Sequence, residues 1–157
     1  MKRILILAIV ALWLAAPAAA QQQQAGPAAQ PGAAAPRTAG VDPNAALNGA
    51  LQVAGMIDAG HVGELWDGAS SVTKRATQRQ PFVEGITKMR KAQGAVAGRG
   101  WTAVRRQQLA GTDQVPAGNY VSVELAAQVA GNKLLRELVT FRVDEDGVMR
   151  FSGYVME

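Results

Sequence analysis

The chain has 157 residues, of which 48% are hydrophobic and 18% are charged, and it contains no cysteine. This composition excludes a disulfide framework, a lipid-acylated cysteine and a cysteine nucleophile. The length suits one folded domain, and the formal net charge of +4 indicates no particular partner.

The N-terminus has the three zones of a secretory signal peptide. Lys2-Arg3 is followed by an apolar run from Ile4 to Leu14 and then by small residues up to Ala20. The run is shorter than the about 20 apolar residues of a membrane-spanning helix. We therefore expect residues 1–20 to be a signal peptide, cleaved after Ala20, and the mature protein to be periplasmic or secreted. An uncleaved membrane anchor is the alternative.

The next segment, residues 21–41, consists mainly of Gln, Ala, Pro and Gly. It has almost no side chains that could form a core, so we interpret it as a disordered linker. Without a cysteine at the cleavage site, no lipid would anchor the mature chain to a membrane. Removal of Lys2 and Arg3 leaves 14 basic and 12 acidic residues, hence a net charge of +2.

Three helices are predicted in the first half of residues 42–157, which we expect to form the single folded domain. Asp42-Pro43 combines an N-cap with a proline suited to the first helical turn, and Gly60 ends this helix. A short second helix is predicted from His61 to about Ser70, and a third helix spans Arg79–Gln93.

Alternating hydrophobicity predicts four strands after the third helix. They span about 96–109, 118–129, 134–144 and 148–156, with turn-forming residues between them. Strands joined in sequence favour an antiparallel meander, covered on one face by the helices. The predicted fold is α+β, with N-terminal helices packed on a curved four-stranded antiparallel sheet in the form of an open cone or roll.

The candidate functional residues are charged groups predicted near the concave face of this sheet. Glu137 is the single charge on the inward face of the third strand, and Arg90 lies at the edge of the apolar stripe of the third helix. A buried carboxylate either acts as a general acid or base or forms an ion pair. The pattern favours an ion pair of Glu137 with Arg90 or Arg99, and a ligand-binding cone with an acidic group is the alternative.

Further catalytic and metal-binding patterns are weak. His61 is the one histidine, and its carboxylate neighbours Asp58 and Glu64 lie on a segment that glycines interrupt, so no metal site is predicted. The sequence has no Gly-x-Ser-x-Gly elbow, phosphate loop or dinucleotide motif. We predict no catalytic residue and no cofactor.

The middle of the chain is basic, with nine basic residues and one acid between Lys74 and Arg106. This basic segment, residues 74–106, could contact nucleic acid, but an exported protein is not expected to meet it. Anionic lipid or cell-wall polymer is the alternative partner, and a solvated surface accounts for the same residues.

A set of residues in the second half of the chain forms a recognisable pattern. It comprises Arg90, Gly94 and Arg99, the turn Pro116-x-Gly118-x-Tyr120, Glu137, and the ending Asp146-Gly147-x-x-Arg150-x-x-Gly153-Tyr154. With this pattern the chain resembles the bacterial domain-of-unknown-function family 4019, small exported proteins, over about Leu47 to Val155. The resemblance implies a cystatin-like or nuclear-transport-factor-like roll and no established activity. Phe82 and Met149 stand where the family usually has Trp, and both keep these positions apolar.

These observations predict a secreted or periplasmic, non-enzymatic domain. Its concave sheet face could hold a small apolar ligand, or its convex face could bind a protein partner, including a second copy in a homodimer through the sheet. Two further hypotheses stay open. One is an enzyme of the roll superfamily with Glu137 as acid or base, and the second is an envelope protein that binds anionic surfaces through residues 74–106.

Overall fold

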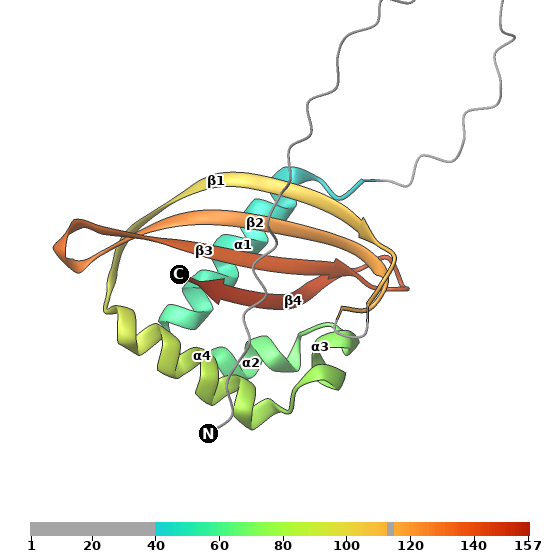
Figure 1. Cartoon of the computed structure of the whole chain (residues 1–157), viewed down its shortest axis with the longest axis horizontal. Helices are drawn as coiled ribbons and strands as arrows, with labels where there is room; N and C mark the ends of the chain where they lie inside the picture. Colours follow the sequence, from blue (N-terminus) through green and yellow to red (C-terminus); the bar gives the residue numbers. More distant parts are fainter. Residues whose placement is uncertain (1–39, 113–114) are drawn as a thin grey trace, which may run out of the picture. The chain divides into compact units, whose positions relative to one another are not determined.

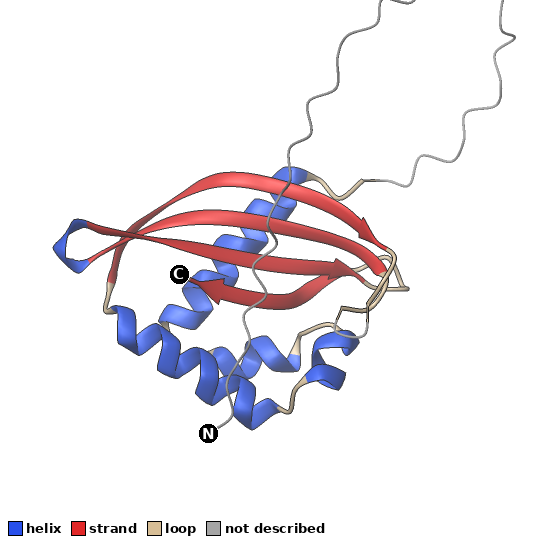
Figure 2. Cartoon of the chain, viewed as in Figure 1, coloured by secondary structure: helices blue, strands red, loops and turns tan. Residues whose placement is uncertain are grey.

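The computed structural model describes residues 40–112 and 115–157. The predicted signal peptide, residues 1–20, and almost all of the predicted linker, residues 21–41, lie outside the described residues. The described part contains four α-helices followed by one four-stranded antiparallel sheet (Figures 1 and 2), which confirms the predicted α+β fold. None of the helices in this part is long and apolar enough to cross a membrane.

Helices α1 and α4 begin where the sequence predicts. Helix α1 (Pro43–Asp58) starts after Asp42, whose side chain accepts a hydrogen bond from a first-turn backbone amide at 3.0 Å. Pro43 fits the first turn because its missing N–H is not needed there. The chain leaves α1 through Gly60, whose φ of +81° favours glycine. Helix α4 (Arg79–Gln93) has the predicted bounds.

The region between these helices differs from the prediction of a single helix that reaches about Ser70. Helix α2 (Val62–Asp67) is shorter, and a further helix, α3 (Ser71–Ala76), follows it. The Ser70 hydroxyl accepts a hydrogen bond from the Val72 backbone amide at 3.3 Å, so Ser70 is the N-cap of α3 and does not end α2. A helix of six residues is too short for hydrophobic periodicity to reveal.

The sheet has the strand order β1-β2-β3-β4, and each neighbouring pair is antiparallel. Its strands are β1 (Val96–Leu109), β2 (Gly118–Val129), β3 (Lys133–Val143) and β4 (Met149–Met156). Strand β1 has two bulges, one between Val96 and Gly98 and one between Trp101 and Ala103. Bulges bend a strand, and β1 curves strongly over the rest of the sheet (Figure 1).

The hydrophobic core lies between the inward face of the sheet and the helices. In Figure 1, α1 crosses behind the sheet. At the centre of the sheet Val123, Leu125 and Val139 are fully buried. Ala50 and Ala54 of α1 belong to the same core cluster, and their small side chains let the helix approach the sheet closely. The concave face is therefore filled by the protein's own side chains.

Candidate functional site

A cluster of charged side chains lies where α1 and α4 end and β1 begins. Five elements each contribute one side chain to this buried ionic cluster, which consists of Asp58 (α1), Arg90 (α4), Arg99 (β1), Glu137 (β3) and Tyr154 (β4). Glu137 is fully buried, and Asp58 is the most exposed of the charged side chains at 30%. The cluster therefore joins two helices to three strands inside the domain.

Arg99 contacts both carboxylates of the cluster. Its Nε donates to Glu137 Oε2 at 2.5 Å and its Nη2 donates to Glu137 Oε1 at 3.0 Å, which makes a bidentate pair. Its Nη1 and Nη2 donate to the two oxygens of Asp58 at 2.5 and 3.1 Å. The Tyr154 hydroxyl donates to Glu137 Oε1 at 2.8 Å. Both oxygens of Glu137 are thus hydrogen-bonded within the protein.

Arg90, the second arginine expected near Glu137, contacts Asp58 instead. Its Nε donates to Asp58 Oδ1 at 2.6 Å, and its Nη1 donates to the Gly94 carbonyl oxygen at 2.6 Å, at the C-terminal end of α4. In the sequence, Asp58 belongs only to a weak metal motif. Asp58 lies four residues after the buried Ala54, so it stands at the edge of the apolar stripe, and this spacing could have revealed it.

The contacts shift the pKa values of three groups of the cluster, Asp58, Arg99 and Tyr154. Burial opposes ionisation of Asp58, but hydrogen bonds from Arg99 and Arg90 outweigh it and hold the pKa of Asp58 below its usual range. Burial likewise opposes the charge of Arg99, but Glu137 and Asp58 raise its pKa. Burial and the hydrogen bond to Glu137 raise the pKa of Tyr154, which therefore stays a donor. Two arginines and two carboxylates balance each other in formal charge.

This arrangement does not suit acid–base catalysis by Glu137. A general base needs an oxygen within hydrogen-bond reach of a substrate, whereas Glu137 is enclosed. A cavity of about 220 Å³ opens beside Asp58 and Arg90, but Glu137 does not line it. His61 pairs with Glu64 at the exposed surface, and residues 40–112 and 115–157 contain no group of three or more potential metal ligands.

A second ionic cluster lies in the turn between β3 and β4. Asp144 accepts hydrogen bonds from the Ser70 hydroxyl at 2.6 Å, from Arg142 at 2.8 Å and from Arg150 at 3.2 Å. Since Ser70 is the N-cap of α3, its bond to Asp144 attaches that helix to the turn. Gly118 packs against the same Arg142, because a Cβ at this position would lie 2.8 Å from Arg142 Nε.

From the buried ionic cluster and the cluster in the turn between β3 and β4, we expect the protein to lose stability in acid. Burial opposes ionisation of Asp144, but bonds from Ser70, Arg142 and Arg150 lower its pKa, as the arginines do for Asp58. An aspartate whose pKa is lower in the folded than in the unfolded protein adds stability at pH values above its unfolded-state pKa of about 3.9. This contribution is lost as the pH falls through its folded-state pKa. We expect the urea midpoint to be steady from about pH 7 to 5 and to fall below about pH 4.

Single substitutions should show that Asp58 and Asp144 each contribute to the fall of the urea midpoint in acid. Asp58→Asn and Asp144→Asn should each lower the midpoint at neutral pH and make the fall in acid shallower. A wild-type midpoint that stays constant down to about pH 3 would contradict the lowered pKa values.

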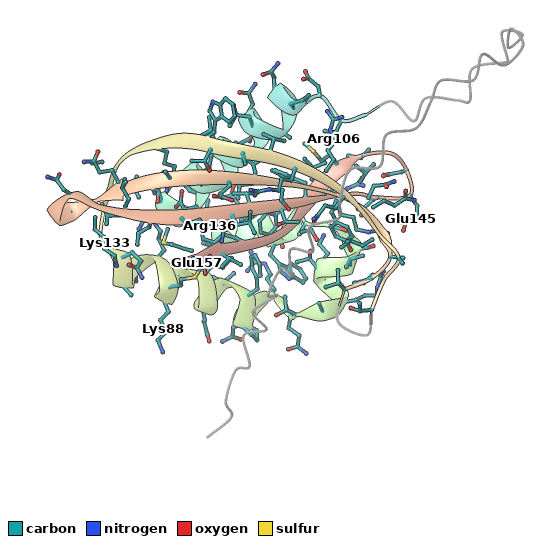
Figure 3. The ribbon with its side chains drawn as sticks, turned by 45° about the horizontal axis from the view of Figure 1, so that its top comes forward. Lys88, Arg106, Lys133, Arg136, Glu145 and Glu157 are labelled. Atoms are coloured by element: carbon teal, nitrogen blue, oxygen red, sulfur yellow. The ribbon has the colours of Figure 1, made fainter. Side chains whose placement is uncertain are left out.

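The basic segment, residues 74–106, does not form one continuous surface. Arg79 and Arg105 pair with carboxylates, and two further arginines of the segment lie in the buried ionic cluster. Figure 3 places Lys88 on α4 and Arg106 on β1 at opposite sides of the view. The positive charge of the segment is therefore divided among different surfaces.

The outward face of the sheet carries a row of ion pairs that we call the outer ladder. Glu124 of β2 accepts from Arg105 of β1 at 2.8 Å and from Arg136 of β3 at 3.3 Å. Arg136 also pairs with Glu157, the residue after β4, and the two lie together in Figure 3. Hydrogen bonds from Arg105 and Arg136 lower the pKa of Glu124 to about 2. The ladder links β1, β2, β3 and the C-terminus.

Apolar side chains stand exposed around the outer ladder. Leu134 of β3 is 69% exposed and Val155 of β4 is 50% exposed. Val155 pairs with Leu138 on the neighbouring strand. Figure 1 shows no described helix in front of the middle of β2 and β3. The outward face therefore combines balanced charges with uncovered aliphatic groups.

The fold and the cluster define a small α+β domain whose curved sheet is closed on its inward face and open on its outward face. The chain belongs to the family described as "Protein of unknown function (DUF4019)", whose model matches residues 49–154. The resemblance seen in the sequence is thereby confirmed. No match was found among curated proteins. Arg90, Arg99, Glu137 and Tyr154 of the family pattern all lie in the buried ionic cluster.

Proposed function

We propose that this protein is an exported, non-enzymatic domain that binds a protein partner through the outward face of its sheet. The observation that carries the proposal is the contrast between the two faces. The inward face is filled by the core and by a fully buried Glu137, whereas the outward face leaves Leu134, Val155 and the outer ladder accessible. Exposed aliphatic groups beside charged ones are typical of an interaction surface.

Binding of a small apolar ligand within the sheet has less support. The residues that would line a cone, Val123, Leu125 and Val139, are fully buried in the core. A hollow of about 420 Å³ beside the turn between β3 and β4 is lined largely by charged groups, among them Asp144 and Arg150. Ligand pockets are usually apolar with a few polar groups, so this hollow is a poor match.

Catalysis and the binding of anionic surfaces also have weaker support. Catalysis by Glu137 would require the carboxylate to leave Arg99, and breaking a buried pair costs about 3–5 kcal/mol. Binding of anionic surfaces would rest on residues 74–106, yet four of the nine basic residues there are neutralised by carboxylates.

Export is part of the proposal and is supported by the layout of residues 1–20. N-terminal sequencing of the protein from the periplasmic fraction should give Gln21 as the first residue. Recovery of Met1 as the N-terminus, in the membrane fraction, would contradict export with cleavage.

Site-specific photo-cross-linking in cells tests the interaction surface. A photo-reactive amino acid at Val155, on the outward face, should give a cross-linked protein product. The matched variant carries the same amino acid at Lys88, an exposed position on α4, and should give none. Equal yields from the two positions would argue against an interaction specific to the outward face.

A further inference from the structure

We infer that the partner of the outward face is a second copy of this chain, and that Leu134 of each copy packs against the outward face of the second. This inference rests on the proposed function, because it names the partner of the same surface. It starts from a hollow of about 220 Å³ on that face, lined by Thr102, Glu124, Ala126, Leu134 and Arg136 among others.

The hollow exists because a small residue stands outward between larger ones. Ala126 lies opposite Arg136, and Gln128 lies opposite Leu134, so Leu134 is next to Ala126 on the same face. The alanine forms the floor, while the leucine rises beside it and is 69% exposed. The hollow offers space for an aliphatic side chain, and the nearest exposed aliphatic side chain belongs to its own rim.

This pairing of a projection with an adjacent hollow is self-complementary. In a two-fold dimer the same patch meets itself, so that residue i contacts residue j and residue j contacts residue i. Leu134 of each copy would lie over Ala126 of its partner, and both exposed leucines would leave water together. A partner of another kind would bury one leucine and fill one hollow.

The charges of the outer ladder also favour a second copy. Arg105 and Arg136 balance Glu124 and Glu157, so two copies of this face do not repel each other. In a two-fold arrangement the arginines of one copy can approach the carboxylates of the second. A strongly acidic or strongly basic partner would meet no complementary net charge here.

The outward face is large enough for a stable contact. The width of the face follows from four strands about 4.8 Å apart, and its length follows from the eight residues of β4 at about 3.3 Å per residue. The product is a flat area of about 500 Å². The side chains that project from the face add accessible surface to this flat area. A standard interface buries about 800 Å² of accessible surface per partner, which is within reach of this face.

Sedimentation velocity on the chain purified from the periplasm tests the inference. We expect wild type to have twice the monomer mass at micromolar concentration. Leu134→Glu should raise the dimer dissociation constant by about tenfold or more, and Ala126→Arg, which fills the hollow, should do the same. Thermal melts establish that both variants are folded. Leu51→Glu is the matched control, because Leu51 is 41% exposed on α1, and it should stay dimeric.

Two results would overturn the inference. One is a wild-type protein that is monomeric at every concentration, and the second is a dimer that Leu134→Glu and Ala126→Arg leave intact. The proposed function fails separately. A monomeric protein whose position 155 cross-links to a different protein would keep the outward face as the interaction surface and reject the second copy as its partner.

Discussion

Replacement of Arg99 by Met should lower the free energy of unfolding by about 3–5 kcal/mol, because it leaves the fully buried Glu137 without its counter-ion. Arg99 donates two hydrogen bonds to Glu137 and two to Asp58, and Met can replace none of them. Urea denaturation at neutral pH measures the loss.

The control for this experiment removes the stranded charge as well. In the variant Arg99→Met with Glu137→Leu and Tyr154→Phe, neither the carboxylate nor the tyrosine hydroxyl is left without a partner. Buried ion pairs replaced by apolar residues of similar size are often neutral in stability, so most of the loss should be recovered. If Arg99→Met alone costs less than about 1 kcal/mol, Glu137 reaches water, and catalysis by this residue regains support.

The second large effect is expected from Leu125→Ala, which should cost about 2–5 kcal/mol because it opens a cavity in a packed core. Leu125 is the largest fully buried apolar side chain in the described ranges and belongs to the core cluster that includes α1. Its matched control is Leu51→Ala, at a position on α1 that is 41% exposed, which should change stability by no more than about 0.5 kcal/mol.

This pair of variants also distinguishes a closed core from an open ligand cone. If the concave face held water or a ligand in the native protein, truncation of Leu125 would remove little packing. A cost for Leu125→Ala similar to that for Leu51→Ala, in urea denaturation followed by circular dichroism, would therefore contradict a core filled by side chains.

The sequence predicts the sheet well because β2 and β3 alternate strongly and the turns between the strands are marked by Pro, Gly and Asp. It predicts α4 to the residue, since an apolar stripe and Gly94 define both its face and its end. It fails at α3, because the pattern predicts that a helix ends at about Ser70. The side-chain pattern around Ser70 is the same whether a helix ends or begins there, and the hydrogen bond that its hydroxyl accepts from the Val72 backbone amide distinguishes the two.

The buried ionic cluster is predictable from the sequence in part. Inward alternation in β3 singles out Glu137, but its partner depends on the strand register. Arg99 of β1 pairs with Ala127 of β2, and a bulge between Val96 and Gly98 precedes it in β1. This bulge sets the register of Arg99 and has no clear signal in the sequence. The outer ladder is not predictable in this way. It joins residues from Arg105 to Glu157 that become neighbours only through the pairing of the strands.

The buried ionic cluster joins helices and strands inside the domain, and in the proposed function the outward face alone contacts the partner. The most direct test of this division is the cross-link yield from position 155 in cells, compared between wild type and the folded variant Arg99→Met with Glu137→Leu and Tyr154→Phe. We expect equal yields at equal amounts of folded protein. Loss of the cross-link from a folded and equally abundant variant would contradict the division, because it would show that the buried cluster itself takes part in binding.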